Sequence, residues 1–329
     1  MTRPRVAIVG AGLMGRWHVD AAHNAGGEIT AIIDPDLTRA RRIAPTGVPV
    51  ATGLEVLAHM SFDVVHVCTP LAIHAEMITA ALDHGAHVVV EKPALPDEQS
   101  ARRIMRHAEV AERMVVPVHQ FTWQRGMRSI VARVDDIGPL HHVEFMTCSA
   151  GADHLSPSAR DSIAADIVPH GFSIARSLTA ESVGTLPWTL QRPVAGEWRL
   201  SAVTPAGCSL SIVVSMNARP TFAACRVLGA NGSASADLFH GFAVFEPPLS
   251  SRGYKLRRPI VTGVRQLTHS IGALTARAVQ RERAYPGLRA LCRQSYDAFF
   301  RGGAPPFGVD EVIDVAAARD MAIRLLPGQ

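Results

Sequence analysis

The chain has 329 residues, 47% of them hydrophobic and 19% charged, with a formal net charge of +4. This length predicts two domains, and since no run of about 18 apolar residues occurs, we expect no transmembrane segment. Five scattered cysteines without CxxC spacing argue against a disulfide framework and a zinc site. Strand-like sequence from Arg5 leaves little room for a signal peptide. We therefore expect a cytoplasmic protein.

The first elements are a buried strand over Arg5–Val9 and a helix over Leu13–Asn24. Between them, Gly10 permits a tight turn, Gly12 lets a ligand approach the backbone, and Gly15 lets the helix pack on the strand. Free N–H groups at the helix start would then form an anion site suited to a pyrophosphate. The cofactor contacts predicted here are Gly10, Gly12, Leu13, Met14 and Gly15.

A second strand, Ile29–Ile33, ends in Asp34, an acid 19 residues beyond Gly15. A carboxylate at this spacing binds the adenosine ribose hydroxyls of a dinucleotide. It also repels a 2′-phosphate, so the sequence favours NAD over NADP. Three arginines that follow could reverse this preference, although a solvated helix face is the simpler interpretation: Arg39, Arg41 and Arg42.

Strand and helix continue to alternate up to residue 118. The expected elements are strands Asp63–Cys68, His87–Val90 and Met114–Val118, with helices Ile73–His84 and Pro96–Arg113. This alternation predicts a doubly wound parallel sheet, in which ligands collect at the carboxyl ends of the strands. Gly10, Asp34, Thr69, Glu91 and Lys92 all follow directly on such ends.

From about Leu140 the sequence changes to successive strand-like runs joined by turns. The runs are His142–Ser149, Thr185–Gln191, Trp198–Thr204, Ser209–Met216, Arg226–Gly229 and Phe242–Phe245. They predict an α+β domain with a large, mostly antiparallel sheet. We expect a Rossmann domain over residues 1–120 and a second domain for substrate binding and oligomerisation over 121–329.

A DxxxH pattern lies within residues 164–173. Because proline is tolerated in the first turn of a helix, Pro169 places Asp166 near an expected helix start. Asp166 and His170 are four residues apart and share one helix face. A histidine can accept the proton of a hydroxyl being oxidised, and a carboxylate can orient its ring. The alternative is a helix cap beside a core histidine.

The motifs GAGLMGRWH, CTPLAIHAE and EKP, in this order and spacing, resemble the Gfo/Idh/MocA (glucose–fructose oxidoreductase and inositol 2-dehydrogenase) superfamily. The resemblance is close over the first 120 residues and looser beyond. It implies that the nicotinamide side is lined by Thr69, Pro70, Leu71 and His74, and that Glu91 and Lys92 reach the nicotinamide ribose. It also implies that Lys92 faces the substrate, that Asp166 and His170 lie beside the nicotinamide, and that the second sheet assembles a homo-oligomer, a dimer or tetramer.

Lys92 is one of only two lysines among 33 basic residues. A point ammonium charge and a guanidinium fork are not interchangeable, so the retention of lysine here favours a role for it in the site. A surface charge at a strand end is the alternative.

The chain departs from its sugar-oxidising relatives at two places. Ser173 stands where many carry a second acid, and residues 119–124 replace an arginine–phenylalanine motif. Both changes argue against a simple free polyol as the substrate. Within the second segment we include Gln120 among the cofactor contacts, with a structural role for His119 or Gln120 as the alternative.

Residues 252–293 contain ten basic side chains and a single acid, Glu282. Nucleic-acid binding is not expected, because the segment has no recognition motif and no aromatic platform. Attachment to a membrane surface, recognition of an anionic substrate, and a solvated face or subunit contact remain. Of the two ligand-binding interpretations, an anionic substrate suits an enzyme best.

The sequence thus predicts an NAD(P)-dependent oxidoreductase acting on a hydroxyl or carbonyl of a sugar, nucleotide-sugar or cyclitol-like metabolite. Lys92 would hold the reacting oxygen, His170 would accept its proton, and Asp166 would steer His170. The alternatives are an imine reductase, a non-redox NAD-dependent lyase or glycosidase, and a non-catalytic NAD sensor.

Overall fold

The computed structural model describes residues 3–53, 61–149, 152, 154–248, 251–282 and 285–326. Arg283, one of the ten basic residues between positions 252 and 293, lies outside these described residues. The chain forms two compact units. The first contains Met1–His119 and Leu288–Ala317, and the second contains Gln120–Gly287 and Ala318–Gln329.

The first unit is built on a six-stranded sheet whose strands all pair in parallel. Its order is β3 (Val50–Ala51), β2 (Glu28–Ile33), β1 (Arg5–Val9), β4 (Val64–Val67), β5 (His87–Val90) and β6 (Val115–Pro117). The strands are apolar and buried because helices cover both faces. The chain order reverses between β1 and β4, which is where a ligand crevice forms in such sheets.

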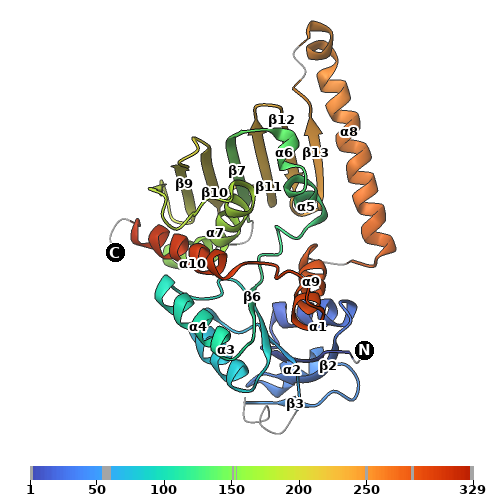
Figure 1. The fold of residues 1–329 in the computed structure, drawn as a ribbon, viewed down its shortest axis with the longest axis vertical. Helices are drawn as coiled ribbons and strands as arrows, with labels where there is room; N and C mark the ends of the chain where they lie inside the picture. Colours follow the sequence, from blue (N-terminus) through green and yellow to red (C-terminus); the bar gives the residue numbers. More distant parts are fainter. Residues whose placement is uncertain are drawn as a thin grey trace. The chain divides into compact units, whose positions relative to one another are not determined.

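Helices α3 (His74–Asp83) and α4 (Glu98–Val110) lie together on one face of this sheet (Figure 1). On the other face, α1 (Leu13–Asn24) packs beside α9 (Leu288–Arg301), while the short α2 (Leu37–Ile43) follows β2. Helix α9 buries Leu291 and Tyr296 in this unit, although the sequence assigned residues 121–329 to the second domain. Helix α9 thus belongs to the first unit because its apolar face is buried there, although it follows the second sheet in the chain.

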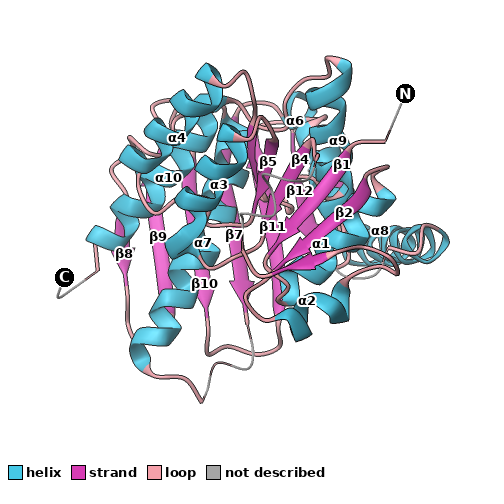
Figure 2. Cartoon of the chain, turned by 90° about the horizontal axis from the view of Figure 1, so that it is seen from below, coloured by secondary structure: helices cyan, strands magenta, loops and turns pink. Residues whose placement is uncertain are grey.

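The second unit contains a seven-stranded sheet, shown in another orientation in Figure 2. Its order is β13 (Phe242–Glu246), β12 (Gly232–Asp237), β11 (Phe222–Gly229), β7 (Leu140–Cys148), β10 (Ser209–Ser215), β9 (Glu197–Val203) and β8 (Thr189–Gln191). Only β7 and β10 pair in parallel in this sheet. The expected fold class, a doubly wound parallel sheet followed by a mostly antiparallel one, is confirmed.

Four helices of the second unit are α5 (Arg125–Val131), α6 (Val134–Ile137), α7 (Pro157–Thr179) and α8 (Arg252–Val279). Helix α7 packs on β10 and β7, and a Cβ at Gly171 would lie 2.8 Å from Ile212 and 2.9 Å from Phe145. The last helix, α10, spans Val309–Arg324. Among the described residues, no helix has the length and apolarity needed to cross a bilayer.

Candidate functional site

The three glycines after β1 differ in what surrounds them. Gly10 has φ +100°, and a Cβ there would lie 2.5 Å from the carbonyl oxygen of Cys68. A Cβ on Gly15 would lie 2.0 Å from the carbonyl oxygen of Gly10, so α1 can approach the turn only without a side chain. At Gly12 a Cβ would meet no atom of the described part of the chain within 4 Å. The open backbone at Gly12 is therefore accessible to a ligand.

Helix α1 begins directly at this opening. Its N-cap is Gly12, no side-chain cap is present among the residues that the structure describes, and its first turn contains no acid. The N–H groups at its start, at Leu13 and Met14, are therefore available to an anion, and no acid of the first turn opposes the positive end of the helix dipole. These features fit the pyrophosphate of a dinucleotide.

Asp34 is buried at the end of β2 and oriented by backbone donors. Its Oδ2 accepts from the N–H of Ala11 at 2.7 Å, and its Oδ1 accepts from the N–H of Asp36 at 2.8 Å. The Nε of Arg39 lies 3.9 Å from Asp34 Oδ1 and donates to Asp36 Oδ2 at 3.0 Å. Of the three arginines singled out in the sequence, Arg39 thus lies beside Asp34 and is held by Asp36, the N-cap of α2.

The segment after β4 is joined to the turn after β5 by a histidine. His74 is buried, with its Nε2 2.7 Å from the carbonyl oxygen of Thr69 and its Nδ1 2.9 Å from that of Pro93. Pro70 caps a short 3-10 turn over Leu71–Ile73. The Oγ1 of Thr69 is buried without a hydrogen-bond partner among the described residues. A buried hydroxyl of this kind is suited to a ligand.

Glu91 belongs to a buried chain of hydrogen bonds that the sequence did not reveal. Its Oε1 lies 2.9 Å from Nε2 of His18, whose Nδ1 lies 2.7 Å from Nδ1 of His66. The Nε2 of His66 lies 2.9 Å from the hydroxyl of Tyr296. Since a carboxylate only accepts, His18 donates to Glu91. This chain of hydrogen bonds fixes the Glu91 carboxylate beside Lys92. The backbone N–H of Lys92 donates to Glu91 Oε2 at 3.1 Å.

The charges around Glu91 determine its ionisation. Burial alone would raise the pKa of Glu91, but the hydrogen bond from His18 and the charges of His18 and Lys92 hold that pKa below its ordinary value. Burial and the charge of Lys92 lower the pKa of His119 to about 4. His119 is therefore neutral at neutral pH, and Glu91 is ionised.

This electrostatic arrangement predicts that the first unit loses stability in mild acid. Burial, and then the charge of Arg113, also lowers the pKa of His87 to about 4, from its ordinary value of 6.5. As the pH falls through 6.5 toward 4, the unfolded state therefore binds protons that the folded state does not, and the stability present above 6.5 is lost. Between about pH 7.5 and about pH 5 we expect a loss of about 2 kcal/mol from His119 and less from His87.

Thermal unfolding at the two pH values measures this loss. In His119→Asn, the decrease in the thermal unfolding midpoint from the higher to the lower pH should be smaller than in wild type. His240→Asn, which changes an exposed histidine, should show the wild-type decrease. Equal falls in wild type and His119→Asn would contradict the assignment.

Helix α7 corrects the expected position of Asp166. The helix begins at Pro157, with Ser156 Oγ accepting from the N–H of Ala159 at 3.2 Å, so Pro169 is internal and Asp166 lies in mid-helix. A proline lacks the N–H that would bond the carbonyl four residues earlier, at Ala165.

Arg319 compensates for this missing donor. Its Nε donates to the carbonyl oxygen of Ala165 at 3.0 Å, and its Nη2 donates to Asp166 Oδ1 at 3.1 Å. Arg319 is buried and lies 153 residues from Asp166. The sequence analysis did not select it, although an internal proline implies a free carbonyl that needs a donor.

The remaining predicted residues of the second unit are buried. His170 lies one helical turn after Asp166, with its ring centroid 4.5 Å from that of Phe121. The Oγ of Ser173 and the Oε1 of Gln120 are buried and have no hydrogen-bond partner within the described part of the chain. Lys92 belongs to the first unit, and Gln120, Asp166 and His170 belong to the second.

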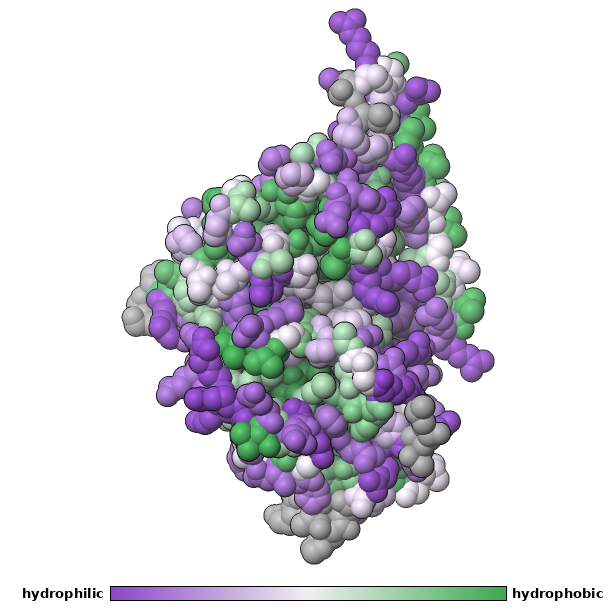
Figure 3. Space-filling view, viewed as in Figure 1, coloured by the Kyte–Doolittle hydropathy of each residue, from purple (hydrophilic) through white to green (hydrophobic). Residues whose placement is uncertain are grey.

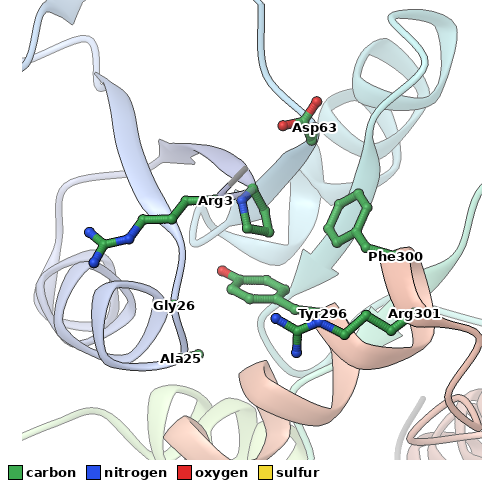
Figure 4. Close-up of a pocket in the computed structure, with 8 residues that line it drawn as sticks. Arg3, Ala25, Gly26, Asp63, Tyr296, Phe300 and Arg301 are labelled. Carbon is green, nitrogen blue, oxygen red and sulfur yellow. The ribbon is translucent and has the colours of Figure 1, made fainter. Parts of the chain in front are cut away.

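A pocket of about 280 Å³ lies at the opposite, amino-terminal ends of the strands in the first unit (Figure 4). Its lining includes Pro4, which precedes β1, and Asp63, which precedes β4. Tyr296, the end of the Glu91 hydrogen-bond chain, also lines it. The pocket contains none of the residues predicted to bind the cofactor.

Residues 4–119 match the model of an oxidoreductase family with an NAD-binding Rossmann fold. Inositol 2-dehydrogenase 4 of Saccharopolyspora erythraea is 32% identical over 189 residues, which cover 54% of this chain and 55% of that protein. The chain thus spans about half the length of the curated relatives it matches.

Two solved structures share the fold over nearly the whole chain. One is the WlbA dehydrogenase of Bordetella pertussis in complex with NADH and UDP-GlcNAcA, with TM-score 0.77, 15% identity, and coverage of 98% of this chain and 95% of that one. The other is levoglucosan dehydrogenase in complex with NADH and levoglucosan, with TM-score 0.77, 16% identity, and coverage of 98% and 97%.

Proposed function

Because the chain belongs to the Gfo/Idh/MocA oxidoreductase family, we propose that it is an NAD-dependent oxidoreductase. It would transfer a hydride between nicotinamide and a hydroxyl or carbonyl carbon of a sugar, nucleotide-sugar or cyclitol-like metabolite. The observation that supports this most strongly is the open glycine turn at Gly12. There an uncapped helix start and the fixed Asp34 carboxylate meet at the carboxyl edge of a parallel sheet.

Each of these groups has a role toward the cofactor. The N–H groups at the start of α1 would bind the pyrophosphate, and Asp34 would accept hydrogen bonds from the adenosine ribose. The nicotinamide end would be lined by Thr69, Pro70, Leu71, His74 and Gln120, with Glu91 and Lys92 at its ribose. When bound, NAD supplies the acceptor for the hydride.

The protein side chains would manage the proton and the charge. In the oxidation direction, the Lys92 ammonium holds the reacting oxygen and stabilises negative charge on it, while His170 accepts the hydroxyl proton. Asp166 stabilises the charged form of His170, and Arg319 holds Asp166 in position. Reduction uses the same groups in reverse, with His170 as the proton donor.

The names of the relatives support the proposed substrate class. One relative is named as an inositol 2-dehydrogenase, and the two structures are complexes with UDP-GlcNAcA and with levoglucosan. Inositol, UDP-GlcNAcA and levoglucosan are all ring compounds with hydroxyl groups. A screen of cyclitols, anhydrosugars and UDP-sugars for a net change in nicotinamide absorbance tests the proposal. An enzyme that uses NAD only transiently, or an NAD sensor, would give no net change.

The environment of Asp34 predicts cofactor preference. We expect NAD to bind at least about tenfold more tightly than NADP, because a 2′-phosphate would face the Asp34 carboxylate. Asp34→Asn removes the charge but keeps an acceptor for the N–H of Ala11, so it should reduce the difference in affinity between NAD and NADP. Arg39→Ala should weaken NADP more than NAD. Fluorescence titration with both cofactors measures these affinities, and tighter binding of NADP by the wild type would contradict the assignment.

A further inference from the structure

Helix α8 lies along β13 (Figure 1), and one line of its side chains faces the sheet. Three of them bind carbonyl oxygens of β13 or of the turn before it: Arg265 at 3.2 Å, His269 at 2.7 Å and Arg277 at 3.1 Å. The fourth, Ala273, is buried. These residues follow one another at intervals of four and define the side of α8 that faces the sheet. That side is polar or small, which is unusual for a helix face packed against a domain.

The apolar side of α8 faces away from the sheet. Five large apolar side chains are between 52% and 71% exposed, and we call them the seam: Ile260, Val264, Leu267, Ile271 and Leu274. At 3.6 residues per turn, the seam lies on the side of the helix opposite the sheet-facing line. Figure 3 shows hydrophobic residues along this outer edge of α8. Such a continuous exposed stripe marks an interaction surface.

The spacing of the seam is that of a heptad repeat. The intervals are four, three, four and three residues, which place Val264 and Ile271 at a positions and Ile260, Leu267 and Leu274 at d positions. In a parallel coiled coil, β-branched residues at a with leucine at d favour two strands, and leucine occupies two of the three d positions here. We infer that α8 pairs in parallel with α8 of a second copy of this chain, through the seam.

The residues beside the seam are compatible with an identical partner. Four of its e and g positions are small and uncharged, namely Gly263, Thr268, Ser270 and Thr275, and a fifth, Val261, is apolar. The one charged residue at such a position, Arg277, comes after the last seam residue and binds the carbonyl oxygen of Phe239. Two copies therefore meet without like-charge repulsion along these flanks, and the small side chains allow close approach.

The charge distribution favours a second copy over a lipid surface. A helix that lies on a membrane surface has an apolar face toward the lipid and a polar face rich in lysine and arginine. Residues 259–276 contain one cationic side chain apart from histidine, Arg265, and it binds the carbonyl oxygen of Phe245. The other basic residues of the first half of α8 precede the seam: Arg252, Lys255, Arg257 and Arg258.

The mass of the full chain in solution tests this pairing. Leu267→Asp and Ile271→Asp each place a charge in the seam, so we expect the assembly measured by sedimentation velocity to have half the wild-type mass at the same concentration. Val279→Asp is the matched control, because Val279 is 79% exposed on the same helix but lies outside the seam. Circular dichroism verifies that all three variants fold.

A crosslink tests the direction of the pairing. In a parallel pair the two copies of residue 274 face each other, so Leu274→Cys should form a disulfide-linked dimer under mild oxidation, and Val279→Cys should not. A wild-type mass that both seam variants retain would overturn the inference. Loss of binding to phosphatidylglycerol vesicles in those variants, with no change in mass, would assign the seam to lipid instead. None of these measurements depends on catalytic activity.

Discussion

Lys92→Ala and His170→Ala are each expected to lower turnover by about a hundredfold or more on whichever cyclitol or sugar substrate the screen identifies. Affinity for NAD should change little, because neither residue contacts the adenosine or pyrophosphate groups in the proposed site. Lys92→Arg should fail nearly as badly as Lys92→Ala, since a planar guanidinium does not replace a point charge. Asp166→Asn should have a smaller effect, because His170 remains and loses only its charged partner.

The chain provides matched controls for these variants. Lys255, the only other lysine, is exposed on α8, and His240 is an exposed histidine in the second unit. Lys255→Ala and His240→Ala should retain wild-type kcat/KM. Turnover that survives in His170→Ala would remove His170 as the proton acceptor, and Lys92 would then be the first candidate.

Arg319→Met is expected to destabilise the second unit by about 3 kcal/mol. The change leaves the carbonyl of Ala165 without its donor and Asp166 without its cation. For a unit of this size, the thermal midpoint should fall by roughly 6–12 °C. Differential scanning calorimetry measures the shift.

The control lies on the same helix. Arg324 pairs with Asp320 but is 74% exposed at its side chain, so Arg324→Met should shift the midpoint by a small fraction of that amount. Equal shifts in the two variants would show that Arg319 does not support the internal proline.

The elements that the sequence predicted best are those determined by local pattern. Arg5–Val9, Leu13–Asn24 and His87–Val90 have the expected bounds, because apolar runs and glycine turns act over a few residues. The start of α7 was expected near Asp166, because Pro169 was interpreted as a start signal, but the helix begins at Pro157. Arg319 supplies the hydrogen bond that makes an internal proline tolerable there.

Other features depend on distant partners and leave no local signal. Strand β12 has the sequence GSASAD, without β-branched residues, and pairing with β11 and β13 determines it. The hydrogen bonds of His66 reach residues 48 and 230 positions away, to His18 and Tyr296. A sequence pattern finds the residues at strand ends, but not the side chains that orient them.

The most direct test of the central claim is the initial rate of NAD reduction by the purified full chain, measured across the screen with wild type and Lys92→Ala. The proposed function predicts that at least one cyclitol, anhydrosugar or UDP-sugar gives a substrate-dependent rise in reduced nicotinamide, which Lys92→Ala abolishes. Tight binding of NAD without net reduction on any of these compounds, and without oxidation of the reduced cofactor by their keto forms, would contradict the claim that the chain is an oxidoreductase of this class.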